Sequence, residues 1–84
     1  MYLKTVKNDL GATRFAFSVG KNFSLKAVLR NRTRRILSGA VKKRFDRIKK
    51  GTDAVIVVLP ASKNKKTEDL DKSVGKLLKK AGLI

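Results

Sequence analysis

The spacing of apolar residues changes at Ser24, and this change limits the chain to a fold that combines strands with helices. Before it, Thr13–Val19 alternates strictly between apolar residues and polar or small ones, which predicts a half-buried strand. Tyr2–Lys7 alternates more weakly, and Asn8–Gly11 between the two segments has the residues of a turn. We therefore expect the two strands to form an antiparallel hairpin.

After Ser24 apolar residues recur every three or four positions, as on one face of a helix. We expect a helix that is capped by Ser24, runs to about Ile48 and is terminated by Lys49, Lys50 and Gly51. Its apolar face is formed by Leu29, Thr33, Ile36, Leu37, Ala40 and Ile48. A neighbouring face carries Ala27, Arg30, Asn31, Arg34 and Ser38.

One more strand and one more helix complete the pattern. Ala54–Leu59 is a continuous, largely β-branched apolar run, typical of a strand buried on both faces. Pro60 ends it, and a polar loop leads to Thr67, the expected cap of a last amphipathic helix that Gly82 closes. The order β-β-α-β-α predicts an α+β fold, a small mixed sheet packed with helices, in a single domain over residues 1–84.

The charge of the chain is large and concentrated. Lysine and arginine number 22 against six acids, and the formal net charge is +16. Residues 21–50 hold twelve of these basic residues and one acid, Asp46, and six of the seven arginines lie between Arg30 and Arg47. Arginine presents a planar fork that suits phosphate. The pattern predicts a basic helix that binds a polyanion. Lys65 and Lys66, in the polar loop before the last helix, lie outside this basic region.

Several classes of protein are excluded by composition. Without cysteine or histidine there is no disulfide framework, no zinc site and no histidine-activated nucleophile. The six carboxylates do not form a cluster in the sequence, and no P-loop spacing occurs, so we expect no catalysis by the protein alone. A membrane-surface role for the basic helix is the weaker alternative, since the strands and second helix must also be buried. We expect an intracellular, cytoplasmic protein.

Two interpretations are open for Phe15 and Phe17. They lie on one face of the predicted strand, where they belong either to the hydrophobic core or to a surface on which unpaired bases stack. Ala16 and Ser18 lie on the opposite face, together with Arg14. If that face is open, it is the better candidate for contact with a nucleic-acid strand.

The segment Lys26–Arg35 is the most specific motif, and it reads Lys-Ala-Val-Leu-Arg-Asn-Arg-Thr-Arg-Arg. It resembles the signature of the bacterial ribonuclease P protein subunit family, whose pattern is Lys-Ala-Val-x-Arg-Asn-x-x-Lys/Arg-Arg. The strand Arg14–Val19, the Gly-x-Asp-apolar segment at Gly51–Val58 and the closing helix resemble the family as well. The resemblance covers essentially the whole chain.

The resemblance implies a ribonucleoprotein that removes the 5′ leader from precursor tRNA. Catalysis would belong to the ribonuclease P RNA and its Mg²⁺ ions, and the protein would bind that RNA and help to hold precursor tRNA. It also implies an α/β sandwich like domain 2 of ribosomal protein S5, with a left-handed β-α-β crossover, whereas the general rule is right-handed. The implied RNA-binding residues are Lys26, Arg30, Asn31, Arg32, Arg34 and Arg35, with Arg14 and Lys21 nearby. The substrate leader would meet the strand of Phe15, Ala16, Phe17 and Ser18.

Two departures from the family pattern affect these expectations. Met1 falls where the second strand of the family would begin. We therefore expect a chain without the family's usual first helix and first strand, as a shortened member, a truncated chain or one with a misassigned start. Leader recognition is the function that we expect this to affect most. The family usually has a basic residue near Ser38, so we expect one RNA contact of the family to be absent there. An uncovered sheet would also favour a homo-oligomer through the N-terminal region. The competing interpretation is a ribosomal or general RNA-binding protein without a role in tRNA processing.

Overall fold

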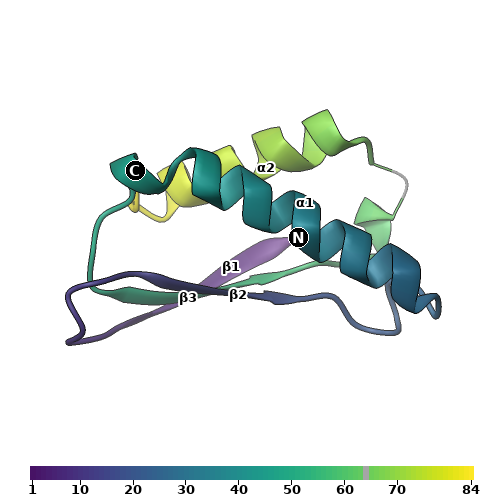
Figure 1. The fold of residues 1–84 in the computed structure, drawn as a ribbon, viewed down its shortest axis with the longest axis horizontal. Helices are drawn as coiled ribbons and strands as arrows, with labels where there is room; N and C mark the ends of the chain where they lie inside the picture. Colours follow the sequence, from purple (N-terminus) through teal and green to yellow (C-terminus); the bar gives the residue numbers. More distant parts are fainter. Residues whose placement is uncertain (64) are drawn as a thin grey trace.

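A computed structural model describes residues 1–63 and 65–84 as a three-stranded sheet with two helices on one of its faces (Figure 1). The elements are β1 (Tyr2–Lys7), β2 (Arg14–Ser18), α1 (Ala27–Lys43), a 3-10 turn (Phe45–Arg47), β3 (Thr52–Val57), a second 3-10 turn (Pro60–Ser62) and α2 (Thr67–Lys80). The order of strands and helices along the chain confirms the predicted β-β-α-β-α pattern.

The expected hairpin between β1 and β2 is wrong, because β3 lies between them. The sheet order is β1-β3-β2, with β3 antiparallel to β1 and parallel to β2. The most apolar strand thus takes the central position, where both of its edges are hydrogen-bonded. The segment 8–13 does turn, with Gly11 at a positive φ of 67°, but it carries the chain past β3. The Asn8 N–H donates to the Gly51 carbonyl and so ties this segment to the start of β3.

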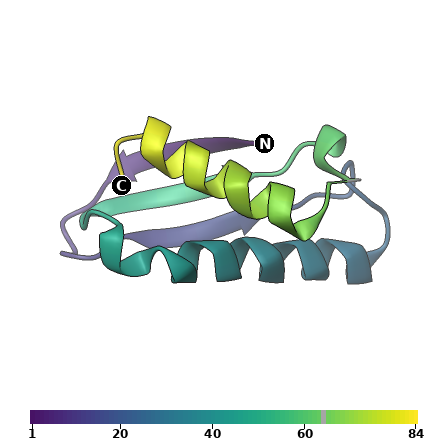
Figure 2. The same ribbon diagram turned by 90° about the horizontal axis from the view of Figure 1, so that it is seen from above.

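The connection from β2 through α1 to β3 is left-handed. Figure 2 views the sheet from the side of the helices, with β2 and β3 both running from left to right and β3 above β2. When the strands are turned to point upward, β3 lies to the left of β2 behind the helix, the reverse of the usual arrangement. The family resemblance implied this handedness.

Helix α1 is shorter at both ends than the sequence predicts. Its N-cap is Lys26 rather than Ser24, whose hydroxyl instead accepts a hydrogen bond from the Lys26 N–H at 3.2 Å. The helix ends at Lys43. Ile48 is buried in the core, but it belongs to the segment that follows the 3-10 turn and not to the helix. The apolar pattern extends beyond the helix because this turn folds back onto the same core.

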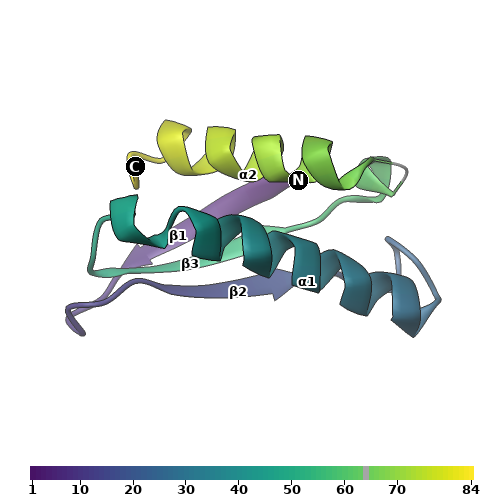
Figure 3. The same ribbon diagram turned by 45° about the horizontal axis from the view of Figure 1, so that its top comes forward.

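Figure 3 shows both helices over one face of the sheet, and the core lies between the helices and that face. Ala54 and Ile56 of β3 are buried there, whereas Val55 and Val57 are half-buried on the opposite face. The expectation that β3 is buried on both faces is therefore wrong. Helices cover a single face in the described residues, and the face of Val55 and Val57, the open face, carries no helix.

Helix α2 packs its apolar side onto this core through Leu70, Val74 and Leu78. Thr67 is its first residue rather than its cap, which is Lys66. At its other end Gly82 has a φ of 75°, and the Leu83 N–H donates to the Leu78 carbonyl at 2.9 Å. This closing motif confirms the role predicted for Gly82.

Candidate nucleic-acid interface

Two arginines of α1 are held beside β2 by carbonyl groups of the chain that leads into the helix. The Arg30 Nη1 group donates a hydrogen bond to the Ser24 carbonyl at 2.8 Å, and the Arg34 Nη2 group donates to the Val19 carbonyl at 3.0 Å. Both arginines are half-buried. Because the acceptors are neutral, each guanidinium is oriented without losing its charge to a carboxylate. The two arginines therefore form a fixed cationic surface.

Asn31 completes the signature stripe, which we define as Arg30, Asn31 and Arg34. The Asn31 Oδ1 atom accepts a hydrogen bond from the Arg34 Nη1 group at 2.9 Å, and Asn31 is exposed. This bond does not use the donors of the Asn31 NH₂ group, which suit an RNA acceptor. Lys26, one turn before Arg30, and Lys21, in the preceding loop, are both exposed near this end of the helix.

The other two signature arginines, Arg32 and Arg35, lie on the side of α1 that faces α2, away from the stripe. Arg32 lines a cavity that α1 shares with the chain before α2, where Lys65 and Lys66 also lie. Arg35 lines the groove between α1 and α2, opposite Glu68. The motif therefore presents its cations on more than one side of one helix, and a single stripe does not contain them all.

The open face of the sheet carries an ion pair at one end. The Arg14 Nε and Nη2 groups donate to the two carboxylate oxygens of Asp53 at 2.8 and 2.6 Å, and Asn8 donates to the same carboxylate at 2.8 Å. These hydrogen bonds, chiefly that from Arg14, lower the pKa of Asp53 to about 2. Arg14 is thus partly neutralised, although its side chain is 64% exposed. Its predicted contact with RNA stays a prediction.

A family model for ribonuclease P matches residues 1–82. The chain belongs to the ribonuclease P family. It is 35% identical over 79 residues to the ribonuclease P protein component of Clostridioides difficile, covering 93% of this chain and 68% of the relative. It is 34% identical over 84 residues to that of Clostridium acetobutylicum, covering 100% of this chain and 68% of the relative. It thus spans about two-thirds of the length of these relatives.

Solved structures of ribonuclease P proteins have the same fold. The structure of a Staphylococcus aureus RNase P protein mutant with defective mRNA degradation activity superimposes with a TM-score of 0.86 at 26% identity, covering 98% of this chain and 69% of the other. The RNase P protein of Thermotoga maritima gives 0.84 at 22% identity, covering 93% and 74%, and bears on the fold alone. The chain is therefore a protein subunit of ribonuclease P, partners ribonuclease P RNA and acts in tRNA processing. The competing ribosomal interpretation is not favoured.

For Phe15 and Phe17 the structure supports the core interpretation. Both side chains lie on the helix-covered face of this ribonuclease P protein, half-buried and packed against the core. Their rings are therefore not offered to bases on the open face. Ala16 and Ser18 are exposed on that open face, beside Val55 and Val57 of β3 in the register. They stay the residues of β2 that can meet an RNA strand.

The structure also groups residues that the sequence leaves apart. Asp53 meets Arg14 because of the parallel register of β2 and β3, and the motif around Asp53 gives no sign of that register. Lys65 and Lys66, which lie outside the predicted basic helix in the sequence, line the same cavity as Arg32. The closely spaced lysines Lys63, Lys65 and Lys66 are visible in the sequence. Their position near Arg32 of the signature depends on the packing of α2 against α1, which the sequence pattern does not show.

No described residues form a group of three or more acidic side chains that could hold a metal ion. Asp71 is bound by Arg44 at 2.9 and 3.1 Å and by Lys43 at 3.3 Å, and these contacts, chiefly that with Arg44, lower its pKa to about 2.

Among the described helices none has the length and apolar character needed to cross a membrane.

Proposed function

We propose that the signature stripe binds the ribonuclease P RNA and that the chain helps this RNA to remove the 5′ leader from precursor tRNA. The observation that carries the proposal is the orientation of Arg30 and Arg34 by neutral carbonyl groups. Cations that are positioned before association lose less conformational entropy when they bind phosphate. We place this activity in the cytoplasm, where its RNA partners are made.

In this proposal the cleavage step belongs to the RNA and its Mg²⁺ ions. Mg²⁺ requires a near-octahedral set of oxygen ligands. The carboxylates of Asp53 and Asp71 are each occupied by an arginine, so these residues do not fit a magnesium site, and we assign no catalytic step to them. The part of the protein is to bind RNA, to orient it and to reduce the repulsion between the two RNA molecules.

The open face of the sheet is where we place the substrate leader. Ala16 and Ser18 expose a strip of small side chains there, and β1, on the other side of β3, contributes Tyr2 and Lys4 to the same face. The Lys4 Nζ atom lies 5.8 Å from the centre of the Tyr2 ring, so a base-stacking surface and a cation are adjacent. An unpaired strand can use both, by stacking and by phosphate contact.

Reconstitution with the cognate ribonuclease P RNA tests the proposal. At low Mg²⁺ concentration we expect correct cleavage at the mature 5′ end of precursor tRNA only when protein and RNA are both present. The variant with Arg30→Ala and Arg34→Ala should need a higher protein concentration for the same rate, and a variant with Lys79→Ala and Lys80→Ala should not. Cleavage by the rigorously purified protein alone would contradict the proposal, as would a lack of stimulation by the wild-type protein.

A further inference from the structure

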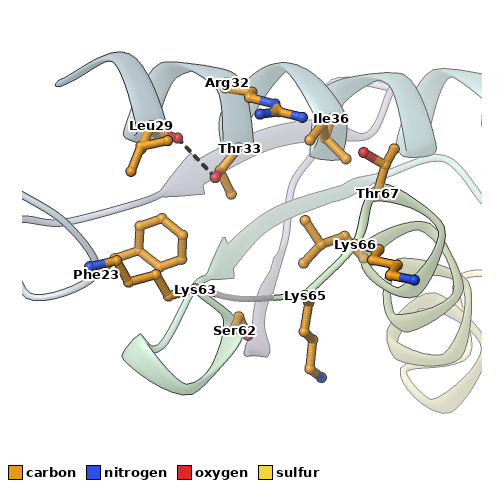
Figure 4. A pocket seen from close by; sticks show the side chains of 11 residues that line it. Phe23, Leu29, Arg32, Thr33, Ile36, Ser62, Lys63, Lys65, Lys66 and Thr67 are labelled. Carbon is orange, nitrogen blue, oxygen red and sulfur yellow. Dashed lines mark hydrogen bonds between the residues drawn. The ribbon is translucent and has the colours of Figure 1, made fainter. Parts of the chain in front are cut away.

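A cavity of about 140 Å³ lies between the first half of α1 and the segment that leads into α2 (Figure 4). Its apolar wall is formed by Phe23, Leu29, Ile36 and Leu70. Its rim carries four exposed cations: Arg32, Lys63, Lys65 and Lys66. In Figure 4, Arg32 lies on the α1 side and Lys65 and Lys66 on the opposite side. The cavity thus combines an apolar interior with a cationic rim.

The rim cations are not consumed by the ion pairs that the structure shows. In the part of the chain that the structure describes, the ion pairs join Arg14 to Asp53, and Lys43 and Arg44 to Asp71. Four positive charges around one opening repel one another unless an anion lies between them. The rim is therefore suited to phosphate.

The size of the cavity selects the kind of ligand. Sites for whole cofactors or drug-sized molecules are typically about 300–1,000 Å³. A volume of 140 Å³ suits one ring system rather than such a ligand. Three hydroxyl side chains also line the cavity, those of Thr33, Ser62 and Thr67. The Thr33 hydroxyl donates to the Leu29 carbonyl at 2.9 Å, and its oxygen can accept a hydrogen bond from a base amino group.

We propose that this cavity takes one unpaired nucleotide of RNA, with its base against Leu29 and Ile36 and its phosphate at Arg32, Lys65 and Lys66. A base within a duplex cannot enter, because its faces are stacked and its edge is paired. The site is distinct from the signature stripe, whose arginines reach Ser24 and Val19 beside β2. The inference rests on the proposed function in that RNA is the partner, and it adds a second contact on the other side of α1.

Nuclear magnetic resonance of the full chain locates the contact. The probe is an eight-nucleotide single-stranded RNA, added to ¹⁵N-labelled protein, with a blunt duplex of the same length as the comparison. We expect the single strand to shift the amide signals of Phe23, Thr33, Ser62 and Leu70, which line the cavity. The duplex should leave these four signals in place. Equal shifts from both probes, or shifts confined to the signature stripe, would overturn the proposal.

Two kinds of variant separate the charge from the cavity. Lys65→Ala with Lys66→Ala should weaken single-strand binding and reduce the slope of log K against log[salt] by about 0.7 units, the value for one phosphate contact on a single strand. Leu29→Phe fills the cavity and should weaken binding by about tenfold, through the lost base contact, with the slope unchanged. Lys79→Ala with Lys80→Ala removes the same charge from the far end of α2 and should have the smaller effect.

The outcomes also distinguish this site from the proposed function. The double lysine variant changes only exposed side chains, so it keeps the test valid if Leu29→Phe fails to fold. If Lys65→Ala with Lys66→Ala and the far-end control lose equal affinity, the cavity is not a site, whereas the proposed function stands as long as the RNA subunit is stimulated. The variant with Arg30→Ala and Arg34→Ala should keep the cavity shifts while it loses affinity for the ribonuclease P RNA.

Discussion

At the scale of single residues, the charges of Arg30 and Arg34 are both fixed and uncompensated. If each neutralises one phosphate, Arg30→Ala with Arg34→Ala should weaken binding to ribonuclease P RNA and flatten the slope of log K against log[salt] by about 1 to 2 units. Fluorescence anisotropy over a series of salt concentrations measures both quantities. Lys79→Ala with Lys80→Ala is the matched control on α2. An equal loss of RNA affinity in the two double variants would show that the stripe contributes only non-specific electrostatic attraction.

Asn31 should behave differently, because its side chain carries no charge. Asn31→Ala removes a directed donor and also the acceptor that orients Arg34 at 2.9 Å. We expect affinity for the RNA to fall by about five- to tenfold while the salt slope stays nearly constant. The same anisotropy series provides the measurement. A slope that changed as much as in the arginine variant would show that Asn31 acts mainly by holding Arg34 in place.

The sequence alone could name the residues of the stripe but not their partners. Arg30, Asn31 and Arg34 fall on one helical face by their spacing, and that much the structure confirms. The pairing of Arg14 with Asp53 depends on the register of β2 against β3, a long-range feature that local spacing does not encode. Arg32 was predicted to bind RNA only from the family resemblance. It follows Asn31 by one residue, which turns its side chain by about 100° around the helix, toward α2.

At the scale of elements, two glycines within the helices differ in their surroundings. A Cβ atom at Gly39 in α1 would meet nothing within 4 Å, so Gly39→Ala should stabilise the protein by about 1 kcal/mol through helix propensity. At Gly75 in α2 it would lie 3.1–3.3 Å from the Arg44 guanidinium, which is anchored to Asp71. Gly75→Ala should therefore gain less. Urea unfolding of both variants gives the comparison, and equal gains would show that Arg44 moves freely.

The link between Arg44 on the α1 side and Asp71 on α2 makes stability depend on pH. The pKa of Asp71 is lowered to about 2 in the folded chain from an ordinary value of 3.8. The folded state thus favours the carboxylate, and this stabilisation is present above about pH 4 and is lost as the pH falls toward 2. Asp71→Asn should flatten the fall in urea midpoint across this range. An unchanged fall would mean that the pair contributes nothing to acid stability.

The sequence could predict whether most elements are strands or helices, but it could not predict which strands pair with one another. The alternation of β2, the apolar run of β3 and the spacing of α2 are local patterns, and each was correct in kind. The hairpin failed because strand pairing is decided by which strand best fills the centre of the sheet, and β3 does so from far along the sequence. The predicted end of α1 at Ile48 failed because the 3-10 turn buries Ile48 without continuing the helix.

At the scale of the whole molecule, the left-handed crossover places the signature where it can act. It sets α1 beside β2, so that Arg34 reaches the Val19 carbonyl at the end of that strand. No principle of local structure predicts this hand, and the general rule predicts the opposite one. Only the family resemblance implied it. The layers and the core could be argued from physical principles, whereas the handedness of the crossover could be expected only from the resemblance to known proteins.

Self-association is the last property that the architecture predicts. β1 and β2 are the outer strands, and β1 exposes Val6 on the open face, 70% accessible, beside the charged Lys4 and Lys7. Unpaired edges favour pairing with a second chain, but a net charge of +16 opposes it. We therefore expect a monomer at about 0.1 M salt and a dimer at about 1 M, where the screening length falls from about 10 to 3 Å.

Light scattering at micromolar protein concentration measures this change, and one substitution tests its location. Val6→Lys adds a charge to the exposed edge strand and should keep the protein monomeric at high salt. Leu10→Lys adds the same charge in the loop after β1, where the side chain is 60% exposed, and should leave the dimer intact. A wild-type monomer at both salt concentrations would contradict the prediction, because screening would then have removed the repulsion without revealing any attraction between the edges. Equal loss of the dimer in the two variants would show that net charge, rather than pairing at β1, controls association.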